Sequence, residues 1–218
     1  MRTPRLVTRR RFLESSAWFS AAALAAPHMC TAADTKPAKL RLAVKYGMIR
    51  VPGATVRQKF ELVKKIGFEG LEIQAPGEVD IAEAVAASKA TGIKIHGVID
   101  SVHWKERLSD PSEEVRAKAV AALKEAIRAA KTVGADTCLL VPGKVSDPKQ
   151  ENFDQCWERS QAGVRECLAL AEECKVVIAI ETVWNEFITK PEHMIRYVDE
   201  INSPWCGAYF DCSNMLKY

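Results

Sequence analysis

The sequence has few of the features that mark several common protein classes. No GxGxxG loop follows the first strand-like run, where residues 45–50 read Lys-Tyr-Gly-Met-Ile-Arg, so a dinucleotide-binding unit is not indicated. No CxxC pair occurs among the seven cysteines. The alanine-rich stretch at residues 15–26 is too short and too weakly apolar to remain in a bilayer as a helix. We therefore expect no stable membrane insertion.

Excess positive charge is also absent from most of the chain. The formal net charge is +3, but residues 1–33 contain five arginines and a single acid, Glu14. Subtracting their +4 from the total leaves −1 for the remainder. A nucleic-acid-binding surface needs clustered lysine and arginine. We therefore expect no nucleic-acid partner.

The basic N-terminus matches a twin-arginine export signal. Residues 8–13 read Thr-Arg-Arg-Arg-Phe-Leu, the alanine-rich stretch follows, and residues 31–33 (Thr-Ala-Ala) offer a cleavage site. A basic, disordered N-terminus is the alternative. We predict an export signal at residues 1–33, a polar linker at residues 34–39 and a periplasmic location. This route carries folded proteins, often with their cofactor already bound.

The cysteines could form disulfides in an exported protein. Most of them instead fall in apolar strand-like runs (Cys138, Cys206, Cys212) or on one helical segment (Cys156, Cys167, Cys174). We interpret them as small buried hydrophobic side chains, with a disulfide as the alternative.

Strand-like and helix-like patterns alternate from Leu40 onward. The strand-like runs cover residues 40–49, 70–74, 93–101, 137–142, 176–183 and 206–210. Between them, apolar residues recur every three or four positions, as in Val56, Phe60, Val63 and Ile66. Gly67, Gly92 and Gly134 each follow a helical run, where a left-handed cap is favoured. Helix starts are indicated at residues 110–114 and 190–192, where proline and acidic residues occur early.

This alternation predicts an α/β fold with a parallel sheet. About six βα units occupy residues 40–218, whereas a (β/α)8 TIM barrel takes about 250 residues. We predict a TIM barrel that is incomplete in this chain, and we expect the 218 residues to be part of a longer product. A six-stranded doubly wound sheet is the alternative.

Two acidic residues stand where strand-like runs end. Glu181 closes the run Val177-Ile178-Ala179-Ile180, and Asp211 closes Ala208-Tyr209-Phe210. Chemistry in such barrels gathers at the carboxyl ends of strands, and paired carboxylates suit Mg²⁺, Mn²⁺ or a similar ion. Glu181 could instead pair with a lysine, and Asp211 could be a helix N-cap.

Several motifs resemble the successive strands of one family. They are Gly67-Phe68-Glu69-Gly70-Leu71-Glu72-Ile73, Ile95-His96-Gly97-Val98, Leu140-Val141-Pro142-Gly143, Ile180-Glu181-Thr182-Val183-Trp184-Asn185 and Phe210-Asp211-Cys212-Ser213-Asn214. In order and spacing they are similar to the sugar phosphate isomerase/epimerase family of xylose-isomerase-like TIM barrels, over residues 40–218.

The resemblance implies a divalent metal ion (Mg, Mn, Co or Zn) held by Glu181 and Asp211. It also implies a histidine on strand seven and a glutamate on strand eight, which have no counterpart before Tyr218. We therefore expect this polypeptide alone to be poorly active or inactive. Asn214 stands where the family often has a histidine.

The implied chemistry is proton transfer with Glu181 as the catalytic base. Removing a proton next to a carbonyl gives an enediolate. Returning it to the neighbouring carbon isomerises the substrate, and returning it to the opposite face epimerises it. The substrate-binding candidates are His96, Asn185, Asn214, His103 and Trp104. For His96 a core histidine, and for His103-Trp104 a cover of the barrel rim, are the alternatives. Glu72 is expected low in the barrel in a structural pair, and Lys45 is a weaker candidate.

The predicted function is a metal-dependent isomerase or epimerase of a small sugar or hydroxy-keto acid. A cyclic-polyol dehydratase and a non-catalytic carbohydrate-binding barrel are the alternatives. The endonuclease branch of the family needs many metal-binding histidines, and this chain has four. A sugar or polyol is the expected partner, and the full-length form could be a homo-oligomer.

Overall fold

The computed structural model describes residues 40–77 and 79–218. The predicted export signal, the linker up to residue 39 and Cys30 lie outside the described residues. From Arg41 to Tyr218 the chain is one compact unit.

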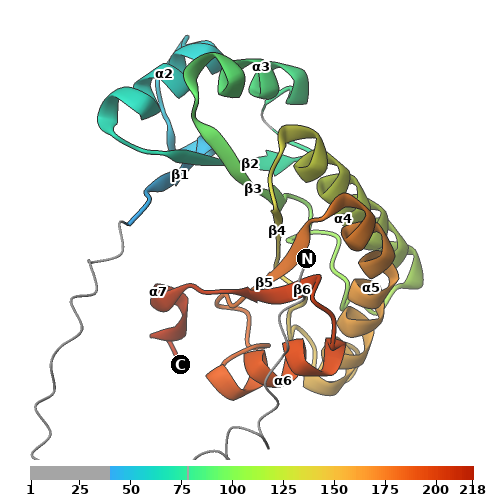
Figure 1. The fold of residues 1–218 in the computed structure, drawn as a ribbon. Coiled ribbons are helices and arrows are strands. Elements are labelled where there is room, and N and C mark those ends of the chain that lie inside the picture. Colours follow the sequence, from blue (N-terminus) through green and yellow to red (C-terminus); the bar gives the residue numbers. More distant parts are fainter. Residues whose placement is uncertain (1–39, 78) are drawn as a thin grey trace, which may run out of the picture. The chain divides into compact units, whose positions relative to one another are not determined.

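The core of this unit is a parallel sheet whose strands follow the order of the chain (Figure 1). The strands are β1 (Ala43–Lys45), β2 (Gly70–Ala75), β3 (Lys94–Asp100), β4 (Thr137–Leu140), β5 (Val177–Glu181) and β6 (Cys206–Tyr209). Each strand pairs in parallel with the next. A doubly wound sheet reverses its strand order at one point, and this sheet does not. The order therefore confirms the barrel prediction and excludes the doubly wound alternative.

Helices connect the strands at the predicted places. They are α2 (Val56–Ile66), α3 (Ile81–Thr91), α4 (Glu113–Val133), α5 (Phe153–Cys174), α6 (Pro191–Ile201) and the short α7 (Cys212–Met215). Gly67, Gly92 and Gly134 end α2, α3 and α4 in the left-handed conformation, with φ of 102°, 78° and 78°. Ser112 caps the start of α4, and Pro191 lies in the first turn of α6. The predicted caps are confirmed.

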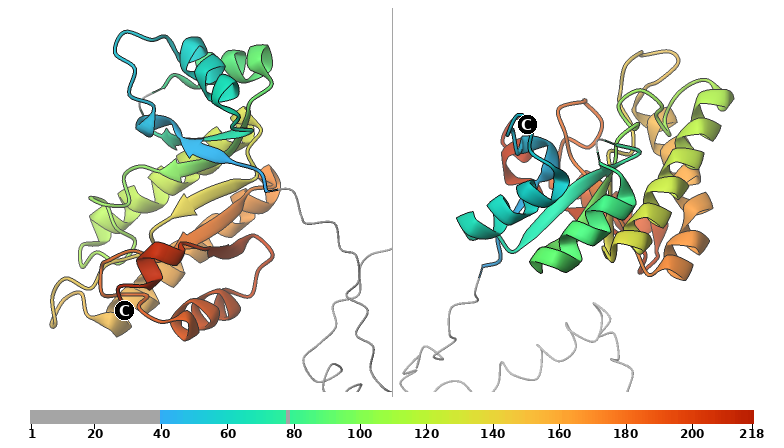
Figure 2. Two further views of the ribbon diagram at one scale, coloured as in Figure 1. Left: turned by 90° about the vertical axis from the view of Figure 1, so that its left-hand side faces the viewer. Right: turned by 90° about the horizontal axis from the view of Figure 1, so that it is seen from above.

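The helices α2 to α6 lie along the outer side of the curved sheet (Figures 1 and 2). The main apolar core forms between these two layers. Ile73 and Ile178 of the strands and Leu123 and Ile127 of α4 are almost fully buried there. This arrangement leaves the other face of the sheet, the concave one, for the remaining side chains.

The first strand is shorter than predicted. The strand-like run covered residues 40–49, but β1 ends at Lys45 and a 3-10 turn, η1, follows at Tyr46–Met48. The ring of Tyr46 is buried and lies 6.4 Å from the ring of Phe60 in α2. The chain therefore leaves the sheet at Tyr46 to pack against the first helix.

Five of the six described cysteines are buried free thiols, as predicted (Cys138, Cys156, Cys167, Cys174, Cys206). The prediction is wrong for Cys212, which is exposed. Cys212 begins α7 rather than continuing the strand, so its side chain leaves the sheet layer.

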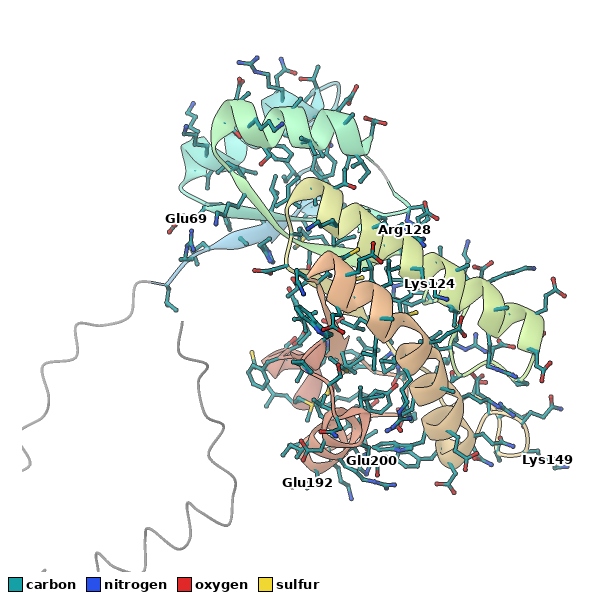
Figure 3. The ribbon with its side chains drawn as sticks, turned by 45° about the vertical axis from the view of Figure 1, so that its right-hand side comes forward. Glu69, Lys124, Arg128, Lys149, Glu192 and Glu200 are labelled. Carbon is teal, nitrogen blue, oxygen red and sulfur yellow. The ribbon has the colours of Figure 1, made fainter. Side chains whose placement is uncertain are left out.

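Charged side chains cover the outside of the helical layer. Lys124 of α4 pairs with Glu166 of α5 at 2.7 Å, and Glu192 and Glu200 lie on α6 (Figure 3). Within residues 40–77 and 79–218, no helix combines the length and the apolar character that crossing a membrane requires.

Candidate functional site

The strand register identifies which side chains share the concave face. The hydroxyl of Tyr209 on β6 donates a hydrogen bond to Oε1 of Glu72 on β2, at 3.1 Å. Lys45 is the register partner of Glu72, and Glu181 is the register partner of Tyr209. Register partners on neighbouring strands point to the same face of a sheet. Lys45, Glu72, Glu181 and Tyr209 therefore all face the concave interior.

A glycine makes room for the Glu72 carboxylate. A Cβ atom added at Gly97 of β3 would lie 3.1 Å from Oε1 of Glu72 and 3.0 Å from Oγ1 of Thr137. Burial raises the pKa of Glu72, while the Tyr209 hydrogen bond and the charges of His96 and Lys45 oppose that rise. The prediction that Glu72 faces inward in a structural pair agrees with this contact.

Glu181 ends β5 in a half-buried position. Its pKa is raised to about 7, first because burial disfavours the charged form and next because of the negative charges of Asp211 and Glu72. Lys45 acts in the opposite direction. Glu181 is thus a carboxyl group that can gain or lose a proton near neutral pH.

Asp211 is the N-cap of α7, as its alternative interpretation held. Its Oδ1 accepts hydrogen bonds from the backbone N–H and the hydroxyl of Ser213, both at 2.8 Å, and from the N–H of Asn214 at 2.9 Å. These bonds, led by that from Asn214, lower the pKa of Asp211. Asp211 also acts electrostatically on Glu181, so the cap carboxylate is a neighbour of the base candidate.

Asn214 joins the ends of β5 and β6. Its Nδ2 donates to the carbonyl of Thr182 at 2.9 Å and to Oδ2 of Asp211 at 3.0 Å. The backbone carbonyl of Asn214 accepts a hydrogen bond from Nε1 of Trp184 at 3.3 Å. The structure therefore places Asn214 beside Asp211, and its contact with substrate stays a prediction.

Asn185 is buried, and its amide is engaged by the protein itself. Its Nδ2 donates to the carbonyl of Gly143, and its Oδ1 accepts from the N–H of Phe187 at 3.2 Å. The bonds fasten the loop after β5 to the loop after β4. The predicted contact of Asn185 with substrate stays a prediction.

His103 and Trp104 lie in the loop after β3, at the carboxyl end of the strand. The side chain of His103 is buried, and its Nδ1 accepts from the N–H of Val141 at 3.3 Å. The centre of the Trp104 ring lies 4.7 Å from that of the His103 imidazole, in an edge-on arrangement, and Trp104 is 55% exposed. Burial, helped by the charge of Lys45, lowers the pKa of His103 to about 4. The structure thus keeps this pair at the predicted end of the barrel.

His96 lies at the other end of the barrel, near the amino ends of the strands. His96 is the third residue of β3, at its amino-terminal end, and an added Cβ at Gly70 would lie 3.3 Å from its Cδ2. It lines a hollow of about 230 Å³ with Arg41 and Lys94, where strands begin. The structure does not bring His96 to the carboxyl ends.

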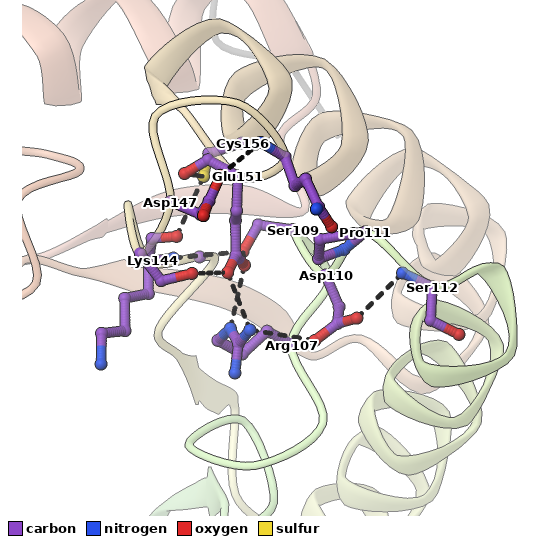
Figure 4. A network of polar contacts seen from close by, with 12 residues as sticks. Arg107, Ser109, Asp110, Pro111, Ser112, Lys144, Asp147, Glu151 and Cys156 are labelled. Carbon is purple, nitrogen blue, oxygen red and sulfur yellow. Dashed lines mark hydrogen bonds and ion pairs between the residues drawn. The ribbon is translucent and has the colours of Figure 1, made fainter.

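An ion pair between Arg107 and the buried Glu151 connects two loops at the carboxyl ends of the strands (Figure 4). Arg107 donates to both carboxylate oxygens of Glu151, at 2.9 and 2.8 Å. Hydroxyls of Ser109 and Ser146 also donate to that carboxylate. These bonds outweigh burial and lower the pKa of Glu151. The loop after β3 is thereby attached to the loop after β4.

Glu181, Asp211 and Glu72 carry the oxygen donors that hard divalent cations prefer. Burial, and next the negative charges of Asp211 and Glu72, raise the pKa of Glu181, and a bound cation would oppose this rise. Among residues 40–77 and 79–218, no group of three or more His, Cys, Asp or Glu side chains is arranged to hold a metal ion.

Sequence analysis missed Tyr209 and the Arg107–Glu151 pair. Tyr209 stands two residues before Asp211, and this period of two could have placed it on the same face. The ion pair joins residues 44 apart in two loops, and no local pattern in the sequence connects them.

Known proteins match this chain in both sequence and structure. L-ribulose-5-phosphate 3-epimerase UlaE of Escherichia coli is 23% identical over 172 residues, covering 74% of this chain and 60% of that protein. The Salmonella paratyphi B protein of the same name is 24% identical over 173 residues, with the same coverage. The chain thus spans about 60% of the length of these curated relatives.

Solved structures show the same fold at low sequence identity. The 3-keto-D-glucoside 4-epimerase YcjR of E. coli has a TM-score of 0.65 at 18% identity, covering 78% of this chain and 68% of that one. A D-allulose 3-epimerase of Methylomonas sp. has a TM-score of 0.68 at 16% identity, covering 82% and 65%. A family model for the xylose isomerase-like TIM barrel matches residues 60–218. Because that match includes β2 to β6 with their connecting helices, the chain belongs to the xylose isomerase-like TIM barrel family.

Proposed function

We propose that this chain carries the proton-transferring part of a metal-dependent sugar epimerase or isomerase, with Glu181 as the base. The observation that supports it most is the opposite tuning of two neighbouring carboxyl groups. The pKa of Glu181 is raised to about 7, whereas that of Asp211 is lowered. Carboxyl groups whose pKa values are driven apart in one site take different roles in acid–base catalysis.

Glu181 has the properties of a base at neutral pH. A base works best when its pKa lies near the working pH, because it then accepts a proton and also releases it. The carbon next to a sugar carbonyl bears the hydrogen it would remove. The proton then returns to the opposite face of that carbon or to the neighbouring carbon.

Asp211 supplies a permanent negative charge beside the base. Four hydrogen bonds from Ser213 and Asn214 fix its carboxylate, so its orientation does not depend on the ligand. Asp211 and Glu181 would hold the divalent ion (Mg²⁺, Mn²⁺, Co²⁺ or Zn²⁺). When bound, such an ion polarises the substrate carbonyl and stabilises the negative charge that develops on its oxygen.

The names of the relatives support a sugar as substrate. The curated relatives are L-ribulose-5-phosphate 3-epimerases, and the solved structures include D-allulose and 3-keto-D-glucoside epimerases. Each of these names describes inversion at a carbon of a keto sugar. We therefore propose a keto sugar as the substrate class.

Hydrogen exchange with solvent tests the proposal directly. The full chain is incubated with L-ribulose, D-tagatose or D-fructose in ²H₂O with Mg²⁺ or Mn²⁺, and deuterium at the carbon next to the carbonyl is measured by NMR. In line with the poor activity expected of this polypeptide alone, we expect exchange with at least one ketose to be slow but measurable. The Glu181→Gln variant should slow it by about 10² or more. Glu192→Gln, on the outer face of α6, is the matched control and should exchange at the wild-type rate (Figure 3).

The outcomes separate the possible reactions. An inverted carbon identifies an epimerase, a shifted carbonyl an isomerase, and loss of water a dehydratase. A chelator should stop the exchange, and added Mn²⁺ should restore it. Absence of exchange with every ketose, or full exchange by Glu181→Gln, would contradict the proposed function.

A further inference from the structure

The imidazole of His103 has a defined tautomer. Its Nδ1 accepts a hydrogen bond from the backbone N–H of Val141, so Nδ1 carries no proton. The neutral ring must then carry its proton on Nε2. The low pKa of the group, about 4, agrees with a neutral ring at physiological pH. His103 is therefore a fixed N–H donor.

This donor has no acceptor within the described part of the chain. The side chain of His103 is 3% exposed, and its Nε2 is buried without a hydrogen-bond partner. A buried donor that lacks an acceptor is costly, and native proteins rarely keep one without a use. The other described side-chain atom of this kind is Nδ1 of His193. His193 belongs to α6, in the outer helical layer, and its ring packs 5.0 Å from that of Phe153.

His103 lies at the carboxyl ends of the strands, the same end of the sheet as Glu181. Its loop begins where β3 ends, and its partner Val141 directly follows β4. Lys45, which faces the concave interior with Glu72, is close enough to influence His103 electrostatically. Trp104 packs edge-on against the imidazole and is itself more than half exposed. Trp104 is thus an exposed aromatic ring in contact with the imidazole that carries the buried donor.

We propose that His103 is a substrate-binding residue whose Nε2–H donates to an uncharged oxygen of the sugar, a hydroxyl or a carbonyl, with Trp104 as the apolar wall beside it. The proposal rests on the proposed function, because it places this donor in the same sugar site as Glu181. A single N–H on an uncharged ring matches a neutral oxygen, whereas phosphate groups are met by cations or by several donors. The site thus contributes recognition of the sugar's own oxygens.

Two variants of the same residue separate ligand binding from folding. In His103→Asn the amide oxygen takes the place of Nδ1 and can still accept from Val141, but nothing reaches the position of Nε2. In His103→Gln the amide reaches the position of Nε2, but the bond to Val141 is lost. His193→Phe is the matched control, because it removes the other unpartnered buried nitrogen, away from the site.

Binding of L-ribulose and D-tagatose to the full chain is measured by calorimetry with Mg²⁺, together with the thermal midpoint of each variant. We expect His103→Asn to keep a near-wild-type midpoint and to bind the ketose about tenfold more weakly. His103→Gln should have a lower midpoint but bind within about threefold of wild type. The ¹⁵N resonance of Nε2 should shift when the ketose binds to wild type.

The outcomes distinguish this inference from the function on which it rests. Full affinity in His103→Asn, or an Nε2 resonance that does not respond to a saturating ketose, would overturn the role of His103 alone. A loss of affinity in His193→Phe equal to that in His103→Asn would also overturn it. A wild-type chain that binds neither ketose would overturn both this inference and the proposed function.

Discussion

At the scale of single residues, Glu181 and Asp211 differ because their local hydrogen bonding differs. Asp211 receives N–H and O–H donors from the turn that it caps. Glu181 is instead half-buried, and the negative charges of Asp211 and Glu72 lie near it. The same functional group is therefore stabilised as an anion at one strand end and destabilised as an anion at the next.

This difference predicts a pH-dependent stability that belongs to Glu181. Its pKa rises from 4.5 in the unfolded chain to about 7 in the folded one, so ionisation disfavours folding. The stabilising neutral form is fully present below pH 4.5 and is lost as the pH rises through about 7. Without divalent ions, Glu181→Gln should match wild type at pH 4.5. At pH 8 it should be more stable by on the order of 1 kcal/mol after allowance for solvent screening.

Urea unfolding of both proteins at several pH values measures this difference. The other buried acid Asp100 is common to both proteins and its contribution cancels in the comparison. Asp211→Asn is a control of opposite sign. The pKa of Asp211 is lowered, so its contribution is present above pH 3.8 and is lost as the pH falls. Equal pH profiles for Glu181→Gln and wild type would refute the raised pKa.

The sequence alone showed that Glu181 and Asp211 end neighbouring strands, but it did not show the hydrogen-bond partners of the two amides. Glu181 and Asp211 each end an apolar run, and that pattern is local. Asn185 and Asn214 were predicted to contact substrate, but their partners are the carbonyls of Gly143 and Thr182, 42 and 32 residues away. A sequence pattern does not show which amides the protein's own backbone engages.

At the scale of elements, the loops after β3 and β4 depend on one buried ion pair. The Glu151 side chain is 1% exposed and its partner Arg107 21% exposed. Arg107 also pairs with Asp110, which receives the N–H of Ser112 at the start of α4 (Figure 4). The guanidinium thus connects the entry to α4 with the entry to α5.

Removing the cation should destabilise the protein strongly. Arg107→Met keeps much of the side chain's volume but leaves the buried Glu151 charge without its partner. We expect a loss of about 3 kcal/mol in the free energy of unfolding. The double variant Arg107→Met/Glu151→Leu should recover part of that loss, because no unpaired charge remains. Guanidinium unfolding curves provide the measurement.

The control for this pair is an exposed one. Lys118 and Glu114 form an ion pair on the surface of α4, and Lys118→Met should leave the unfolding curve unchanged within error. If Arg107→Met were as mild as Lys118→Met, the loops would not depend on this contact.

Helices and strands themselves were largely predictable, because their signals are local. Gly134 after α4 and Ser112 before it are read directly from the sequence, and the structure confirms both caps. The register shift in β3 had one local signal. His96 is the residue left without a register partner between Leu71–Ile95 and Glu72–Gly97, and Gly97 next to it is the kind of strand glycine that often marks a bulge.

At the scale of the whole molecule, the order of strands follows the chain, and the sheet curves. Curvature brings Tyr209 on β6 within hydrogen-bonding distance of Glu72 on β2, although 137 residues separate them. Alternating helices and strands predicted the parallel order. The contact across the interior depends on the curvature, which no local pattern specifies.

That contact allows the curvature to be tested in solution. Tyr209→Phe keeps the ring but removes the hydroxyl that donates to Glu72, and should cost about 1–2 kcal/mol of unfolding free energy. The hydrogen bond opposes the raised pKa of Glu72, so its loss raises that pKa further, and the loss of stability should grow from pH 4.5 to pH 8.

A double-mutant cycle of Tyr209→Phe with Glu72→Gln should give a coupling of about 1 kcal/mol, because the two side chains touch. The same cycle with Glu200→Gln, whose carboxylate binds Trp157 in the outer layer, should be additive. In a flat sheet β2 and β6 would lie four strand spacings apart, roughly 19 Å, and no coupling could arise. Additivity in both cycles would therefore contradict the curved sheet and, with it, the interior that brings Glu72 near Glu181.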